Sequence, residues 1–330
     1  MPFQTLKYSR LLLVLFLFFI SSCEKPVTPD PTPVEPVESS FQEYEDRGTI
    51  ENPELDEASG LIYSLKNPGY LWSFNDSGNP NKIFLLNSSG KGIFNFSLNN
   101  APNRDWEAMS ILKESDGSAT LFVADIGDNF AVHDQYFLYW FKEPVVDVTS
   151  SQVNQTISEV SKIQFTLSDG IKRDMEAIMI DQVSKDIYII SKREDQKKLY
   201  KISADKLVNG NVTKAEFVKD LDFSNPFSTN ENVKTYFFVT DATVSPDNTE
   251  ILVRNYGEIY YWKRKNGESI PDALARQAKV VPSRSKYSSK DGQGEPQGEG
   301  VSFSTSGDGY YTISESADAG PIHLYFFKKK

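Results

Sequence analysis

Short apolar and aromatic runs, separated by turn residues, recur along the chain from residue 57 onwards. Five segments open with an acidic residue, a small residue and an apolar run, and each is followed by two further runs of the same kind. These segments begin at Glu57, Glu107, Glu176, Asp241 and Glu299. Runs of this length, rich in aromatic and β-branched residues and bounded by Gly, Asn, Asp or Pro, are typical of β-strands. The pattern therefore predicts five copies of one β unit.

Each unit is expected to contain four strands in chain order. The first strands are predicted at Ala58–Tyr63, Glu107–Leu112, Glu176–Asp181, Asp241–Ser245 and Glu299–Ser304. The second strands are predicted at Tyr70–Asn75, Ala119–Asp125, Asp186–Ser191, Glu250–Asn255 and Gly309–Ser314. The third strands, the richest in aromatic residues, are predicted at Lys82–Leu86, Tyr136–Trp140, Lys198–Ile202, Glu258–Trp262 and His323–Phe327. Outer strands are predicted at Gly92–Leu98, Lys162–Leu167, Lys214–Asp220 and Gln277–Val281.

The fifth unit reaches the end of the chain before an outer strand appears, whereas Tyr44–Ile50 has no unit of its own. Both facts are explained if this N-terminal strand completes the last unit and closes a ring of sheets. We therefore predict an all-β fold, a β-propeller of four-stranded blades over residues 43–330. The count is five blades, with six possible if residues 143–160 or 205–235 hold another. A β-sandwich with coincidental repeats is the alternative.

The first 22 residues are predicted to be a signal peptide. Lys7 and Arg10 precede an apolar run, Leu11–Ile20, that is too short to span a bilayer. The run ends at Ile20-Ser21-Ser22-Cys23, which resembles a bacterial lipoprotein cleavage box. Cys23 is the only cysteine, so an internal disulfide is excluded and the thiol is expected to carry lipid. Residues 23–42 are rich in Pro and Glu and are predicted to form an extended tether.

Composition bears on address and partners. Glu24 follows Cys23, which by resemblance to lipoprotein sorting suggests the outer membrane of a bacterial cell envelope. The chain has 46 acidic against 35 basic residues and a formal net charge of −11. A nucleic-acid partner is not expected, because phosphate binding needs a basic face. We expect a monomer attached to the membrane through its N-terminal lipid.

The acidic residue that opens each unit would face the central channel, because the first strand of a blade lines it. Glu57, Glu107, Glu176, Asp241 and Glu299 would then form a ring of carboxylates. Like charges so close together raise one another's pKa values, so the ring needs shared protons, basic partners or a hard cation. Ca²⁺ prefers such oxygen ligands. Further oxygens are predicted at the ends of second strands, from Asp125, Asp128 and Asn129.

Matching strand ends in other units carry residues that could hold an anionic ligand. They are Asn75 and Asp76 in the first unit, Lys192 and Arg193 in the third, and Arg254 in the fourth. An acidic, metal-binding side facing a basic side would suit a phosphate ester. The alternative is structural, because Asp and Asn at strand ends commonly cap turns. Under either interpretation Arg104 and Arg173 are expected to be ion-pair partners of neighbouring acids.

Other catalytic signatures are missing. The two histidines, His133 and His323, are too few for a histidine-rich zinc site. The sequence contains no Gly-x-Ser-x-Gly, no phosphate loop and no dinucleotide fingerprint.

Several segments resemble a family of secreted bacterial propellers described as phytase-like esterases, related in style to senescence-marker and gluconolactonase propellers. They are Ala58-Ser59-Gly60-Leu61, Trp72–Gly78, Asp105-Trp106-Glu107, Asp125–Asn129, Asp174-Met175-Glu176-Ala177 and Gln297-Gly298-Glu299-Gly300. The resemblance implies a calcium-supported hydrolase of phosphate or carboxylic esters. Glu107 and Glu176 are then the expected catalytic carboxylates, one of which acts as the base. A non-enzymatic surface propeller that binds a protein or a glycan is the second hypothesis.

Overall fold

Each predicted unit is an antiparallel sheet whose strands pair in chain order. The computed structural model describes Met1 and residues 40–222, 235–287, 294–316 and 320–330. In the first unit the strands are β2 (Ala58–Tyr63), β3 (Tyr70–Asn75), β4 (Lys82–Asn87) and β5 (Phe94–Leu98). β2 is buried along its whole length, as the strand lining a channel in a closed fold should be.

Three further units repeat this order. The second contains β6 (Trp106–Lys113), β7 (Ala119–Asp125), β8 (Tyr136–Lys142) and β10 (Ser161–Leu167). The third contains β11 (Met175–Ile180), β12 (Ile187–Ser191), β13 (Lys197–Ile202) and β14 (Val212–Leu221). The fourth contains β15 (Val239–Val244), β16 (Glu250–Asn255), β17 (Ile259–Lys263) and β18 (Lys279–Val281).

The fifth unit joins the two ends of the described chain. Its strands are β19 (Gln297–Phe303), β20 (Gly309–Glu315), β21 (His323–Lys329) and, as the outermost strand, β1 (Phe41–Thr49). β1 pairs antiparallel with β21. The prediction that an N-terminal strand completes the last unit is confirmed.

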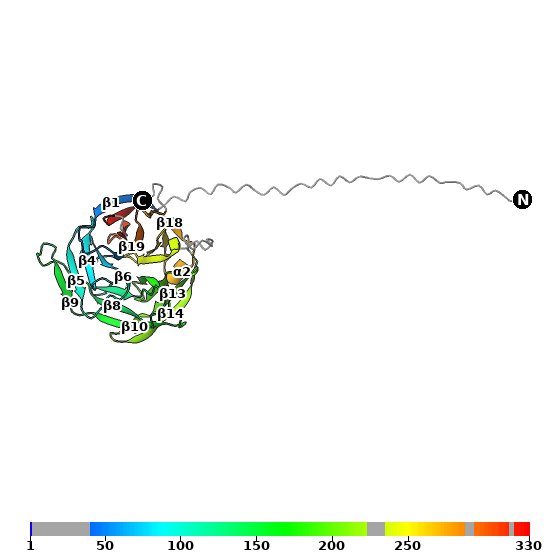
Figure 1. Cartoon of the computed structure of the whole chain (residues 1–330), viewed down its shortest axis with the longest axis horizontal. Coiled ribbons are helices and arrows are strands. Elements are labelled where there is room, and N and C mark those ends of the chain that lie inside the picture. The colour runs from blue at the N-terminus through cyan, green and yellow to red at the C-terminus, as the bar shows by residue number, and fades with distance from the viewer. Residues whose placement is uncertain (2–39, 223–234, 288–293, 317–319) are drawn as a thin grey trace. The chain divides into compact units, whose positions relative to one another are not determined.

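The first strands of the units form a closed ring. β2 lies against β6, β6 against β11, β11 against β15, β15 against β19, and β19 returns to β2. Figure 1 shows β6 and β19 near the centre of the sheets and β5, β10 and β14 toward the periphery. Sheets whose first strands surround one axis define a β-propeller. The number of blades stays a prediction, since residues 223–234 lie outside the described part of the chain.

Two features at the outer edge were not predicted. β9 (Asn154–Ile157) pairs parallel with β5, so the stretch 143–160 contains a strand that extends the first sheet. β14 pairs with β13 over one half and parallel with β10 over the other, which joins the second and third units.

In the described part of the chain, helical structure is confined to short connections. These are η1 (Ala204–Lys206), η2 (Thr235–Phe237) and α2 (Ile270–Leu274). The Ser269 side chain accepts the backbone N–H of Asp272 and so caps α2. Within the described residues, no helix has the length and apolar character needed to cross a membrane.

The apolar core fills the spaces between neighbouring units. One cluster joins the fourth, fifth, first and second units, another the second and third, and another the third and fourth. Trp72, Trp106 and Trp262 are fully buried, and the indole N–H of each donates a hydrogen bond. Residues Ser39–Lys330 form one compact unit. The predicted signal peptide and Cys23 lie outside the described residues.

Candidate functional site

A β-bulge interrupts the first strand of every unit at the same place. In β6, for example, the register shifts between Trp106, opposite Asp125, and Ala108, opposite Ala124, so Glu107 is the extra residue. The corresponding bulge residues of the five units are Ser59, Glu107, Glu176, Thr240 and Glu299. A bulge re-aims a side chain and is common near functional sites. The five bulges therefore fix which residues are equivalent around the axis.

This register corrects the predicted ring of five carboxylates. Glu107, Glu176 and Glu299 share the bulge position, but Glu57 lies two residues before Ser59 and is exposed. The Glu57 side chain accepts a hydrogen bond of 2.6 Å from Asn79. The Ser59 hydroxyl takes the expected place and donates to Glu107 over 3.2 Å.

Asp241 is also displaced, because it follows the bulge residue Thr240. It is fully buried, and its carboxylate accepts the backbone N–H groups of Ala242 at 2.8 Å and Val301 at 2.9 Å. Burial raises the pKa of Asp241 well above its ordinary value, against these hydrogen bonds. The geometry makes Asp241 a link between the fourth and fifth units.

Five carboxylates do converge at the end of the ring where the first strands begin. Two groups of three share Glu107, and within each group one oxygen from every residue lies within 4.8 Å of the others. The groups are Asp76, Asp105 and Glu107, and Glu107, Asp174 and Glu176. We call these five residues the acidic centre. Asp105 and Asp174 occupy equivalent positions, each directly before the strand pair that flanks the bulge.

Four residues of the acidic centre are buried, and Asp76 is half-buried. Asp105 is 7% exposed, and its Oδ1 has no hydrogen-bond partner among the described residues. Burial and the nearby Asp76 raise the pKa of Asp105 to about 6. Burial likewise raises the pKa of Glu107 well above its ordinary value, with Glu176 and Asp76 adding to the effect. Ionised oxygens that lack partners in a buried place are costly, so the centre calls for protons or a cation.

Gly127 leaves room for the carboxylates of Asp105 and Glu107 beneath the turn that follows β7. A Cβ on Gly127 would lie 2.5 Å from Asp105 Oδ2 and 2.5 Å from Glu107 Oε1. The turn after β7 therefore passes directly over both carboxylates, and any side chain at this position would displace them.

Two basic residues at the end of β12 border the acidic centre. Lys192 Nζ lies 2.6 Å from Glu176 Oε1, and Arg193 lies 2.6 Å from Asp174 Oδ2. Burial alone would lower the pKa of Lys192, but Glu176 and the other neighbouring acids hold it well above its ordinary value. Burial raises the pKa of Glu176 to about 8, although Lys192 acts in the opposite direction.

Two further residues near the acidic centre, Tyr256 and Glu315, were not predicted from the sequence. The residue before each bulge pairs with Asn75, Asp125, Ser191, Asn255 or Ser314 of the second strand, and the residues that follow these partners are Asp76, Ile126, Lys192, Tyr256 and Glu315. Tyr256 and Glu315 therefore occupy positions equivalent to those of Asp76 and Lys192. Tyr256 hydrogen-bonds Glu299, whose pKa burial raises well above its ordinary value. Burial, with Asp76 and Glu57 nearby, raises the pKa of Glu315 to about 7. Aligning the second strands by their last residues could have found both.

Three predicted metal ligands lie near the acidic centre but have partners of their own. Asp125 pairs with Arg104 at 3.0 Å. Asp128 accepts the backbone N–H groups of Val132 at 2.7 Å and His133 at 2.9 Å, and so shapes the following turn. Asn129 is exposed and accepts a hydrogen bond from Arg193.

Asn75 and Arg254, predicted to bind a ligand, are placed among backbone groups. Asn75 accepts the N–H of Glu57 at 3.2 Å and donates to the carbonyl of Glu54 at 2.6 Å. Arg254 is 1% exposed and pairs with the buried Glu295. It also donates to the carbonyls of Gly300 at 2.8 Å and Ile313 at 3.0 Å, between the fourth and fifth units.

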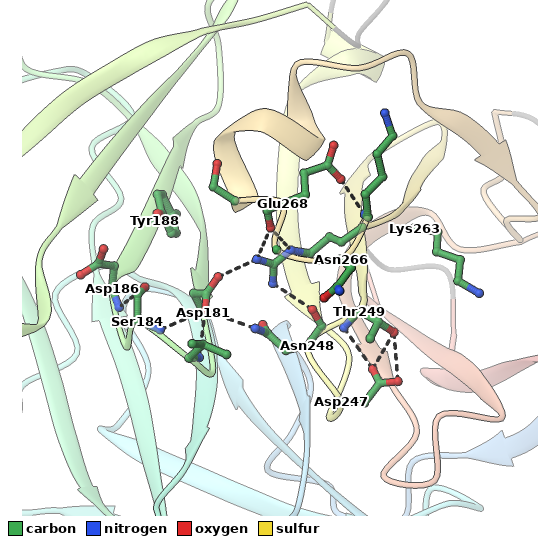
Figure 2. A pocket seen from close by; sticks show the side chains of 15 residues that line it. Asp181, Ser184, Asp186, Tyr188, Asp247, Asn248, Thr249, Lys263, Asn266 and Glu268 are labelled. Atoms are coloured by element: carbon green, nitrogen blue, oxygen red, sulfur yellow. Dashed lines mark hydrogen bonds and ion pairs between the residues drawn. The ribbon is translucent and has the colours of Figure 1, made fainter.

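A cavity of about 840 Å³ lies at the opposite end of the strands, where the first strands finish. Figure 2 shows the hydrogen bond that Asn248 donates to Asp181, which is 3.2 Å long. Arg264 joins them, 2.8 Å from Asp181 Oδ2 and 2.6 Å from the Glu268 carbonyl. These contacts tie the third unit to the fourth, and the acidic centre has no residue in this cavity.

Comparisons with known proteins add little to this geometry. No protein-family model matches the chain, and no curated protein matches it. Among solved structures it is similar to a luciferin-regenerating enzyme, at a TM-score of 0.43 and 12% identity, over 86% of this chain and 94% of that one. It is also similar to a PQQ-bound aldose sugar dehydrogenase from Streptomyces coelicolor, at a TM-score of 0.42 and 10% identity, over 89% and 99% of the two chains. Likenesses this distant carry no argument about activity.

Proposed function

We propose that the acidic centre binds a hard divalent cation, Ca²⁺ in the first instance, which holds a small anionic ligand or ester at this end of the channel. The observation that carries the proposal is the convergence of buried carboxylates around Glu107, one with an unpartnered oxygen. Oxygens that share one Ca²⁺ each lie about 2.4 Å from it, so they lie at most about 4.8 Å apart. In each group one oxygen of every residue lies within 4.8 Å of the others, so both groups meet this requirement.

The predicted metal ligands are revised accordingly. Glu107 and Glu176 remain, and Asp76, Asp105 and Asp174 join them. Five carboxylates against Lys192 and Arg193 leave an excess of negative charge, which a divalent cation would offset. Glu57, Asp125, Asp128, Asn129, Asp241 and Glu299 are not needed as ligands.

The same arrangement supports ester hydrolysis as the reaction. Bound Ca²⁺ would supply positive charge that polarises an ester or phosphoryl oxygen. Lys192 and Arg193 are placed to attract the anionic group of a ligand. Glu107 or Glu176 would act as the base that takes the proton of an attacking water. The resemblance to phytase-like esterases supports the same class of reaction.

A thermal melt tests the cation site. For the wild-type protein we expect Ca²⁺ at about 100 times its dissociation constant to raise the melting temperature by about 5 °C, since a ligand that binds only the folded state stabilises it. Glu107→Gln removes the shared carboxylate and should abolish the rise. Glu216→Gln, on the exposed face of β14, should keep it. Equal rises in both variants would refute the proposal.

A substrate screen separates the enzymatic from the non-enzymatic hypothesis. Carboxylic esters and phosphate monoesters would be offered to the wild-type protein and to Glu107→Gln and Glu176→Gln. Turnover that disappears in these two variants supports hydrolysis at the acidic centre. A protein that binds Ca²⁺ but turns over no ester would favour the second hypothesis, a surface propeller that binds a protein or a glycan.

We also propose that the protein is anchored to the cell envelope, in an outer membrane, by lipid on Cys23. The support is the sequence alone: a basic start, an apolar run, a cleavage box and an acidic, proline-rich tether. Replacement of Cys23 by Ser should move the protein from the membrane fraction to the soluble fraction.

A further inference from the structure

The fourth unit places aromatic rings where other units place charged groups. In the second and third units the residue two positions before the bulge residue is an aspartate, Asp105 or Asp174. In the fourth unit the residue at this position is Phe238. Directly after the second strand, the first and third units have Asp76 and Lys192, whereas the fourth has Tyr256. The fourth unit therefore borders the acidic centre with aromatic side chains, and we call this part of the border the aromatic sector.

Two more tyrosines extend this sector outward. The Gly257 N–H donates to the Tyr236 carbonyl at 3.0 Å, and the Ser285 hydroxyl donates to the Tyr256 carbonyl at 2.5 Å. These bonds hold residues 236, 256 and 285 together. The rings of Tyr236 and Tyr287 stack with centroids 4.1 Å apart and an interplanar angle of 28°. Tyr287 is 40% exposed, so the sector presents an open aromatic surface.

Cations lie along the border between this aromatic sector and the acidic centre. Lys192 Nζ lies 5.6 Å from the centre of the Tyr256 ring, and the Arg193 guanidinium lies 5.1 Å from that of Phe238. Both residues also pair with the acidic centre, through Glu176 and Asp174. A ligand whose anionic group reaches the cation site and Lys192 would thus extend its remaining part over aromatic rings. Flat apolar groups gain most from such contacts.

The small number of cations limits the charge of the ligand. Besides Lys192 and Arg193, the described residues of the border include Lys197, which lies 5.7 Å from the Phe238 ring centre, and Lys286, which lies 5.0 Å from the Tyr287 ring centre. Lys192 and Arg193 already pair with Glu176 and Asp174, so these four basic residues cannot balance the many phosphates of a polyphosphorylated sugar in a chain with a net charge of −11. They suit a ligand with one or two negative charges.

We infer that the ligand of the acidic centre is a mono- or dianion carrying an aromatic or similarly flat apolar group, with Phe238, Tyr236 and Tyr287 as the residues that select it. This inference rests on the proposed function, since it concerns the same site. It assigns an aryl phosphate, or an anionic ester with an aryl group, as the substrate class in preference to a sugar polyphosphate.

Binding of two phosphonates tests the inference. Phenylphosphonate and methylphosphonate carry the same anionic group, and neither is hydrolysed. With saturating Ca²⁺, isothermal titration of the full mature protein should show phenylphosphonate binding about ten-fold more tightly. Tyr287→Ser combined with Phe238→Leu should reduce this ratio to about two-fold or less and leave methylphosphonate binding unchanged. Tyr44→Ser, at an exposed tyrosine of the fifth unit, is the matched control and should keep the full ratio.

The outcomes separate the inference from the proposed function. Equal binding of the two phosphonates by the wild-type protein would overturn the aromatic selection and leave the cation site standing. Binding of neither would overturn the inference, and loss of the Ca²⁺-dependent rise in melting temperature as well would overturn the proposed function. If the tyrosine and phenylalanine replacements weaken both probes equally, the two residues support the fold and do not select the ligand.

Discussion

Lys197 is a buried cation that lowers the stability of the fold at neutral pH. It is 2% exposed, and its ammonium group donates to the Glu194 carbonyl at 2.5 Å. Burial lowers the pKa of Lys197 from the ordinary 10.5 to about 8. Between these two values the unfolded chain holds a proton that the folded chain does not, so the free energy of unfolding rises with pH over this window.

The variant Lys197→Met removes this dependence. At pH 7 we expect the variant to be more stable than the wild-type protein by up to about 3 kcal/mol, less the value of the lost hydrogen bond. The advantage should shrink as the pH rises from 8 to 10, because the wild-type side chain then loses its charge. Urea unfolding of both proteins across this range measures the difference. A difference that is independent of pH would contradict the assignment.

Single residues of the site could be predicted only in part. Glu107 and Glu176 were identified because the Asp-x-Glu-Ala motif repeats around them. Glu57 was misplaced because its Glu-Ala pair matches that motif in letters, whereas strand pairing aligns Ser59 with Glu107. The partner strand and its bulge decide which residue faces the axis, and neither is written in the local sequence. Tyr256 and Glu315 directly follow the predicted second strands, so an alignment of those strands by their last residues would have found them.

At the level of elements, strands that carry the core were predicted best. β2 and β3 begin and end at the predicted residues, because alternating or continuous apolar runs mark them. Outer strands begin one to three residues away from the predicted residue and end at most one residue away from it, as in β14. β9 was missed altogether, since Asn-Gln-Thr-Ile has no apolar pattern and joins β5 through backbone pairing.

Glu143, just after β8, shows how one residue joins two elements. Its carboxylate accepts the backbone N–H groups of Leu65 at 3.2 Å and Lys66 at 3.0 Å, the Trp72 indole N–H at 2.8 Å, and the Ser64 hydroxyl. Glu143→Ala would leave these donors of the first unit without their acceptor. We expect a loss of about 3 kcal/mol in the free energy of unfolding.

Chemical denaturation of Glu143→Ala beside Glu159→Ala measures this loss. Glu159 is an exposed acid of the same connection, so its removal should change stability by less than about 0.5 kcal/mol. Similar stabilities for the two variants would show that the turn at residues 64–67 keeps its conformation without Glu143.

For the whole molecule, closure of the ring is the decisive contact. β1, at the start of the fold, pairs with β21, at the end of the chain, and so covers the edge of the fifth sheet. Phe41 is 1% exposed and lies edge-on to the rings of Tyr310, 4.8 Å away, and Tyr261, 5.4 Å away. An uncovered edge strand is a template for association with other chains. Loss of β1 would therefore expose the edge of β21 and remove the pairing that ties the start of the fold to its last unit.

Two truncations isolate this contribution. A chain that starts at Ser40 keeps β1 and should melt like the mature protein, because the composition of the preceding residues predicts an extended tether and not a part of the apolar core. A chain that starts at Ile50 lacks β1 and should melt at least about 10 °C lower and elute as aggregates in size-exclusion chromatography, since burial of Phe41 and a whole row of backbone pairs is lost. A synthetic peptide of residues 40–49, added to the shorter chain, should restore part of the melting temperature by occupying the open edge. Identical melting of the two chains would mean that the ring is held closed by the contact of β2 with β19 alone.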